Sequence, residues 1–177
     1  VVGYDDNESY TGLDWFQDLF DAIINKAVLR IQYRTFYDVS HDWIIHPYYI
    51  KEYNNRWFLF GLNEENHSIH NIALDRIEEI EQVNKEYIPT DIDFERYLDD
   101  VVGVSVSASE KLTIRLQFSE HRFPYVLTKA LHRSQRVVDL DNRIVEINVI
   151  PNNELEALIL SYGKDVEVLS PPEYKNQ

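Results

Sequence analysis

The spacing of apolar residues changes twice in the first third of the chain. Between residues 16 and 27 apolar side chains recur every three or four positions, as in an amphipathic helix: Phe16, Leu19, Phe20, Ile23, Ile24 and Ala27. Thr11 and Asp14 have the spacing of a capping box at the start of this helix. From Val28 to Phe36 the period becomes two, which predicts a strand with Leu29, Ile31 and Tyr33 on one face and Arg30, Gln32 and Arg34 on the other.

Three more strands are predicted between residues 43 and 77. Trp43 to Ile50, Arg56 to Leu62 and Ile69 to Ile77 are rich in aromatic and branched residues, and two polar turns separate them. The segment 57–60 (WFLF) is apolar at consecutive positions, so both faces of that strand should be covered. A helix followed by four or five antiparallel strands predicts a small SH3-like or Sm-like barrel, because closure removes sheet edges.

The pattern restarts beyond residue 103. The stretch from Val83 to Asp100 loses periodicity and predicts a linker with one helical turn near Phe94 to Leu98. After this linker the sequence predicts a strand at 111–118 and a helix at 119–130 with Pro124 in its first turn. It then predicts hairpin strands at 135–140 and 143–150, a helix capped by Asn152 or Asn153, and a strand at 166–169. This β-α-β-β-α-β order is that of a ferredoxin-like fold. The chain is therefore predicted to be α+β, with a tail (1–12), a barrel domain (13–83), a linker (84–110) and a C-terminal domain (111–177).

Composition narrows the possible functions. The net charge is −14, with acidic residues spread along the chain, so the chain by itself is a poor binder of duplex DNA. Cysteine is absent, which excludes disulfides and thiolate metal sites, and no apolar run is long enough to span a bilayer. We expect a cytoplasmic protein without a membrane partner. Methionine is also absent, even at position 1, which predicts a fragment of a longer protein.

No catalytic motif is visible. The chain lacks a cysteine nucleophile, a G-x-S-x-G sequence and a glycine-rich phosphate loop. His67 and His70 fall at a turn and a strand start, where their odd spacing points them to opposite faces, so we predict no metal site and no cofactor. The chain is not expected to be an enzyme.

A binding pocket on the barrel is the more specific hypothesis. Polar and aromatic side chains that the strands would display are its candidate residues: Tyr33, His46, Tyr48, Trp57, His70, Asn71 and Arg76. The Arg76 guanidinium would offer a planar fork to a phosphate or carboxylate. The alternative is an ordinary salt bridge from Arg76 to Asp75, Glu78 or Glu79. For Trp57 the alternative is a place in the barrel core.

A second basic cluster lies in the C-terminal domain. Lys129, His132, Arg133 and Arg136 form the densest group of basic residues in an acidic chain. They could contact a nucleotide, a nucleic-acid strand or a second subunit. The alternative is a solvated loop between a helix and a strand.

Several segments together resemble the WYL domain family. HPYYI (46–50), RWFLFG (56–61) and ALDRI (73–77) follow one another at the family's spacing, with Trp57-Phe58-Leu59 in place of Trp-Tyr-Leu. TKALHRSQ (128–135) and EVLSPPEY (167–174) resemble the extension, here called WCX-like, that follows WYL domains in many bacterial regulators. The resemblance covers nearly the whole chain. It implies the ligand-sensing part of a bacterial transcriptional regulator whose DNA-binding domain lies N-terminal to this chain.

The resemblance also implies particular roles. Arg76 corresponds to the arginine of the family's LDRI motif, which is associated with ligand recognition, and the expected effector is a nucleotide or a short single-stranded nucleic acid. Phe58 lacks the hydroxyl of the family's central tyrosine, and His70 and Ala73 replace residues that are commonly basic, so this pocket should be less basic than usual. We expect a homodimer that reaches duplex DNA only through the missing domain. The alternatives are direct binding of single-stranded nucleic acid and a dimerisation scaffold without ligand.

Overall fold

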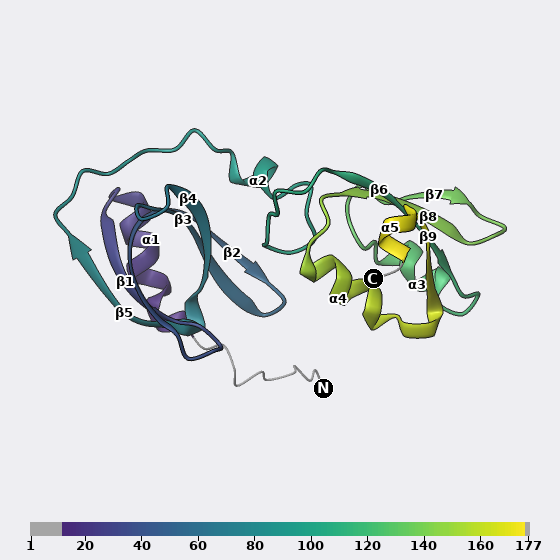
Figure 1. Cartoon of the computed structure of the whole chain (residues 1–177), viewed down its shortest axis with the longest axis horizontal. Coiled ribbons are helices and arrows are strands. Elements are labelled where there is room, and N and C mark those ends of the chain that lie inside the picture. The colour runs from purple at the N-terminus through teal and green to yellow at the C-terminus, as the bar shows by residue number, and fades with distance from the viewer. Residues whose placement is uncertain (1–11, 176–177) are drawn as a thin grey trace, which may run out of the picture. The chain divides into compact units, whose positions relative to one another are not determined.

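The computed structural model describes residues 12–175 and divides into two compact units between residues 92 and 93 (Figure 1). Each unit has its own hydrophobic cluster. Thr11, the residue expected to cap the first helix, lies outside the described residues. The fold is α+β, as predicted.

The first unit consists of short helices and five antiparallel strands. In chain order these are η1 (Leu13–Trp15), α1 (Phe16–Ile24), β1 (Val28–Arg34), β2 (Ser40–Tyr53), β3 (Arg56–Asn63), β4 (Ser68–Ala73), η2 (Leu74–Arg76) and β5 (Ile77–Val83). The strands pair in the order β4-β3-β2-β1-β5, and Figure 1 shows the sheet curling around α1. This is the small barrel that the sequence predicted.

The first helix buries a narrower face than its sequence pattern suggested. Leu19 and Ala22 are buried and join the barrel core, whereas Phe20 and Ile24 are 46% and 64% exposed. Both therefore lie outside the buried face of the helix. The helix has only nine residues, and its contact with the sheet is completed by Phe16 and Ile23 at the edge of the core.

The strands follow the predicted alternation, with one interruption. Leu29, Ile31 and Tyr33 of β1 are buried. Consecutive residues Leu59 and Phe60 of β3 are both fully buried, which confirms that this strand is covered on both faces. The predicted third strand 69–77 is wrong in its second half, because the chain leaves β4 at Ala73, makes the 3-10 turn η2, and starts a separate strand β5 that the sequence analysis did not identify.

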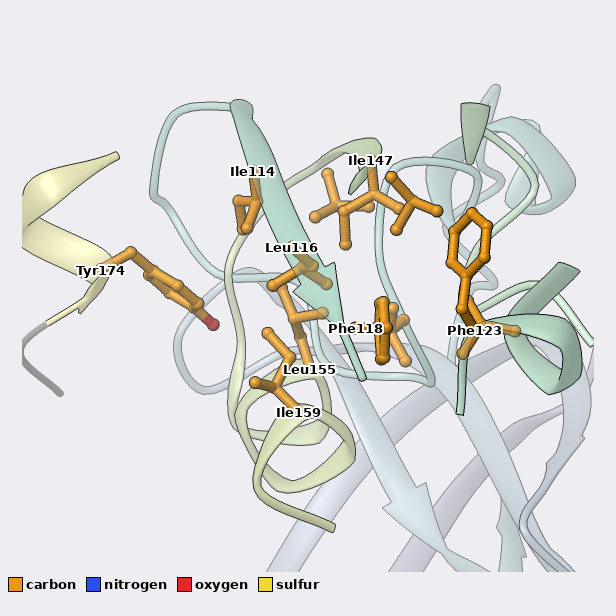
Figure 2. Packing of buried hydrophobic residues seen from close by; sticks show 12 residues of the cluster. Ile114, Leu116, Phe118, Phe123, Ile147, Leu155, Ile159 and Tyr174 are labelled. Carbon is orange, nitrogen blue, oxygen red and sulfur yellow. The ribbon is translucent and has the colours of Figure 1, made fainter. Parts of the chain in front are cut away.

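The second unit has the predicted ferredoxin-like order. Its elements are α2 (Phe94–Tyr97), β6 (Leu112–Phe118), α3 (Phe123–Thr128), β7 (Arg136–Asp139), β8 (Ile144–Val149), α4 (Asn153–Ser161), η3 (Gly163–Asp165), β9 (Val166–Ser170) and α5 (Pro172–Lys175). The strands pair antiparallel in the order β7-β8-β6-β9. Figure 2 shows the core between the sheet and the helices, with Ile114, Leu116 and Phe118 from β6, Phe123 from α3, and Leu155 and Ile159 from α4.

Much of the aperiodic stretch before residue 105 packs within the second unit. Phe94, Leu98, Val101, Val102 and Val104 are buried, and Val102 belongs to the same core as β6 and β8. The predicted helical turn near Phe94 is present as α2, capped by the side chain of Asp93. Isolated apolar residues in irregular structure have no period, so a pattern search does not detect their burial.

Asn152 holds this irregular stretch against α4. Its side-chain oxygen accepts a hydrogen bond from the Leu155 amide at 2.8 Å, which caps the helix. Its side-chain nitrogen donates to the carbonyls of Val102 and Ser105, each at 2.8 Å. One buried amide therefore satisfies both a helix end and two carbonyls of the preceding segment.

Replacing Asn152 with alanine should destabilise the second unit by about 2–4 kcal/mol, since it removes the helix cap and leaves two carbonyls unpaired. The measurement is urea unfolding followed by circular dichroism, with hydrogen exchange of the β6 and β8 amides. Asn153→Ala, at the exposed neighbouring position, is the control and should change stability by less than about 0.5 kcal/mol. Equal stability of the two variants would contradict the role given to Asn152.

Candidate functional site

The three-residue turn η2 presents the arginine of the LDRI sequence. Leu74 is fully buried and anchors the turn to the barrel core. Asp75 and Arg76 follow it in the same turn. The chain at Gly12 packs so closely on this turn that a Cβ there would lie 2.4 Å from the Leu74 carbonyl carbon. The Trp15 indole nitrogen donates to the Ile77 carbonyl at 3.1 Å. The start of the described chain and the arginine turn are thus in direct contact.

All three carboxylates proposed as alternative partners of Arg76 are bound to other residues. Asp75 pairs with Arg56 at 2.7 Å, and Glu78 accepts from Nε of Arg34 at 2.6 Å. Glu79 accepts from the Gln32 amide at 2.6 Å. Within residues 12–175 Arg76 forms no ion pair, and its buried Nε has no hydrogen-bond partner. The ordinary salt bridge that would explain Arg76 is therefore not formed.

An exposed aromatic side chain covers the Arg76 guanidinium. Phe36, in the loop between β1 and β2, has its ring centroid 3.0 Å from Cζ of Arg76 and 5.5 Å from Cζ of Arg56. Phe36 is nevertheless 72% exposed, and its neighbour Tyr37 is 90% exposed. Two guanidinium groups and an open aromatic face thus lie together at one place on the barrel, which we call the arginine–phenylalanine site (Phe36, Arg56, Asp75, Arg76).

Two polar atoms of this site are buried without partners. They are Nε of Arg76, a donor, and Oδ1 of Asp75, an acceptor. A buried unpaired polar atom costs about 1–3 kcal/mol, so such atoms call for a ligand or an ordered water. A ligand that carries both an acceptor and a donor, as well as a flat surface, would satisfy the site.

Tyr33 and His70 belong to a separate aromatic group. Trp43 stacks on Tyr33 at 5.0 Å and on His41 at 4.7 Å, and meets the edge of His70 at 5.1 Å. The ring nitrogens of His70 lie 3.5 and 2.9 Å from the side-chain amides of Asn63 and Asn66. Burial lowers the pKa of His70, which favours the neutral ring and makes a cationic role at neutral pH less favourable than the sequence suggested.

His46 and Tyr48 hold the segment that follows the barrel. His46 is fully buried, with Nδ1 accepting from the Ile88 amide at 3.1 Å and Nε2 lying 3.1 Å from Glu64. The Tyr48 hydroxyl donates to the Ile88 carbonyl at 2.8 Å, and that of Tyr87 donates to the Pro47 carbonyl at 2.7 Å. These contacts support a structural role for both predicted residues, away from an open pocket.

The remaining two predicted residues are not part of the arginine–phenylalanine site. Trp57 meets the edge of Phe16 at 4.9 Å and packs against the barrel core, which is the alternative considered for it. Asn71 is exposed on β4, opposite Phe60 in the strand register. The seven predicted pocket residues are thus spread over the barrel, and only Arg76 lies in the arginine–phenylalanine site. Phe36 and Asp75 were missed, although two successive aromatics in a turn, Phe36 and Tyr37, were a visible signal.

The second basic cluster is partly neutralised by carboxylates. Arg133 pairs with Asp99, and Arg136 pairs with Glu146. The His132 ring is hydrogen-bonded to Ser134 at 2.8 Å, and burial lowers its pKa. Lys129 is exposed. The arrangement favours surface ion pairs over a concentrated cationic patch.

Glu146 lies at the centre of a three-residue ion-pair ladder. Arg115 on β6 and Arg136 on β7 are its register neighbours, and each donates from Nε at 2.9 Å. Only 5% of the Glu146 side chain is exposed. Hydrogen bonds from Arg115 and Arg136 lower the pKa of Glu146 below its ordinary 4.5, so its stabilising effect is complete above that value and is lost as pH falls through the folded-state pKa.

We expect Glu146→Gln to lower the free energy of unfolding by about 2 kcal/mol at neutral pH, because charge-assisted hydrogen bonds are lost. The difference from wild type should shrink as the pH falls below 4.5. Urea unfolding across this pH range measures it, with Glu120→Gln, at an exposed position, as control. A difference that stays constant into acid would contradict the role of the ionised carboxylate.

Among residues 12–175 no three His, Asp or Glu side chains are grouped as a metal ion would require. No helix in this range is long and apolar enough to cross a membrane.

A five-stranded barrel followed by a ferredoxin-like unit, with an arginine turn on the barrel, defines the class to which the chain belongs. Residues 14–82 match the family model of the WYL domain, and residues 110–177 match that of the WCX domain. The chain belongs to the family of proteins in which a WYL domain is followed by a WCX domain. This pair fits a regulatory, ligand-sensing module, and neither domain is of an enzymatic family.

Two solved structures are similar to this chain at low sequence identity. A crystal structure described as a CRISPR Cas-related protein is 15% identical with a TM-score of 0.61, and the match covers 93% of this chain and 49% of that one. Proteasome accessory factor B/C (PafBC) of Arthrobacter aurescens is 13% identical with a TM-score of 0.41, covering 99% of this chain and 26% of that one. The chain thus spans half or less of the length of either protein. No curated protein matches it.

Proposed function

We propose that this chain is the effector-sensing part of a bacterial transcriptional regulator and that the effector binds at the arginine–phenylalanine site. The observation that supports this most is the unpaired state of Arg76, whose neighbouring carboxylates Asp75, Glu78 and Glu79 are all engaged elsewhere. A partly buried guanidinium without an anion is a costly arrangement unless a ligand supplies one.

The chemistry of the site favours a nucleotide or a short single-stranded nucleic acid. Arg56 and Arg76 provide positive charge for a phosphate, and the exposed ring of Phe36 provides a surface on which a base can stack. The unpaired acceptor of Asp75 suits a donor on the base edge. A small anionic metabolite without a flat ring would leave Phe36 unused.

Binding would regulate through the contact between this site and the start of the described chain. Gly12 packs directly on the backbone of Leu74 and Asp75, so a ligand that displaces the turn also acts on the segment leading from any preceding DNA-binding domain. The effector shifts the regulator only if it binds one arrangement of domains better than another. In this scheme the full-length regulator is a homodimer that contacts duplex DNA through that domain.

Direct binding of single-stranded nucleic acid is the second candidate, supported by Tyr37 beside Phe36, which extends the exposed aromatic surface. A strand that follows several cations should dissociate steeply as salt is added, whereas a mononucleotide should respond weakly. A third candidate is a dimerisation scaffold, in which the site stays empty.

Arg76→Ala should weaken binding of a short labelled single strand or a nucleotide by about tenfold or more, since it removes a charge-assisted hydrogen bond. Phe36→Ala should weaken it by a comparable factor through lost stacking. Fluorescence anisotropy at low and high salt measures both. Arg96→Ala is the matched control, because it removes the same charge from an exposed side chain of the second unit.

The results of these binding measurements distinguish the three candidate functions. Binding that Arg76→Ala leaves unchanged would contradict the proposed site. No binding by the folded wild-type chain would favour the scaffold, and tryptophan fluorescence can verify the fold of each variant because all three tryptophans lie in the barrel unit.

A further inference from the structure

The second unit contains a cavity that the proposed function does not use. It lies between α4, η3, β9 and α5 and has a volume of about 320 Å³. Its walls include Ile159, Val166 and Val168, and Leu160, 72% exposed, lies at its rim. This size falls in the range of small-molecule sites, which are largely apolar with a few polar groups.

A buried hydroxyl without a partner belongs to this cavity. Tyr174 of α5 is 8% exposed and packs against the core of the second unit, but its hydroxyl has no hydrogen-bond partner in the part of the chain that is described. Figure 2 shows the side chain reaching from α5 toward Leu155 and Ile159, with the hydroxyl at its inner end. A phenylalanine would fill the same space without leaving a polar atom unpaired. The unpaired hydroxyl therefore indicates that a ligand forms a hydrogen bond with it.

The charged residues among the described lining residues of the cavity are both acidic. Glu156 on α4 and Glu167 on β9 line it, together with Tyr174. Glu156 forms no ion pair with any side chain that the structure describes. Burial and then the charge of Glu156 raise the pKa of Tyr174 to about 12, so the phenol stays neutral and can both donate and accept a hydrogen bond.

The lining of the cavity also includes a glycine. Gly163 has a φ of 53°, in the left-handed region, and no atom lies within 4 Å of where its Cβ would stand. The helix α4 ends at Ser161, and Tyr162 is its C-cap, so Gly163 lets the chain turn directly after the helix.

We propose that this cavity is a second ligand site and that it takes a small organic cation with an apolar body. The body would lie on Ile159, Val166 and Val168, the cationic group would pair with Glu156, and a polar group of the ligand would bond to the Tyr174 hydroxyl. This site is separate from the arginine–phenylalanine site in both residues and ligand charge, so the regulator would respond to two ligands of opposite charge.

The test uses tryptamine, which has an aromatic body, an N–H donor and an ammonium group, and indole-3-propionate, which has the same ring system and an anionic group. Calorimetry on the whole chain should show saturable millimolar or tighter binding of tryptamine, about tenfold weaker binding of indole-3-propionate, and loss of that preference in Glu156→Gln. Tyr174→Phe should weaken tryptamine binding while raising the melting temperature of the free protein, because the unpaired hydroxyl is removed.

Arg76→Ala provides the control, because it should leave tryptamine binding unchanged. If the arginine–phenylalanine site proves to bind no effector, the result of the tryptamine experiment is therefore unaffected. The proposal is overturned if the folded chain does not bind tryptamine at millimolar concentration. It is equally overturned if both probes bind alike, or if Glu156→Gln and Tyr174→Phe bind tryptamine as wild type does.

Discussion

The barrel unit depends on how its sheet turns between β4 and β5. Only the three residues of η2 connect these two edge strands, and the fully buried Leu74 holds the turn to the core. Gly12 fits against the turn because it has no side chain, and Trp15 bonds to the residue that follows it. A tight and well-packed turn gives Arg76 a fixed position, which a binding residue requires.

The distribution of ion pairs around this turn explains why Arg76 forms no ion pair with another described residue of an acidic protein. The chain has 31 acidic and 17 basic residues, so an isolated arginine is unexpected on numbers alone. The carboxylates near it are nevertheless bound by Arg56, Arg34 and Gln32, which reach them from neighbouring strands. The strand register determines these pairs, and the Arg76 guanidinium instead faces the exposed ring of Phe36.

The two units have different kinds of candidate site for physical reasons. In the barrel, the polar groups lie at a turn outside the core, so charge and stacking dominate there. In the second unit, the cavity opens between a helix and an edge strand, and its walls are largely apolar. The polar groups among its described lining residues are Glu156, Glu167 and Tyr174. A regulatory module with both can distinguish ligands by charge as well as by shape.

Most of the secondary-structure elements and the family could be predicted from local sequence patterns, although β5 was not. Period-two alternation located β1, the β7–β8 hairpin followed from two apolar runs around Asp141 and Asn142, and the Asn152 cap was visible as a polar residue before an apolar helix. These are local signals, set by neighbouring residues. The LDRI motif likewise indicated Arg76 before its surroundings were known.

Which residues share a site could not be predicted from the sequence, because it depends on contacts between distant segments. His46 was predicted for the pocket, but its Nδ1 accepts a hydrogen bond from the Ile88 amide, 42 residues away. Trp57 was also predicted for the pocket, but it packs against the barrel core. Phe36 joins Arg76 across 40 positions of sequence, and Tyr174 comes to Glu156 through the packing of α5 beside β9. Such contacts depend on strand order, register and packing between distant segments, and no local period encodes them.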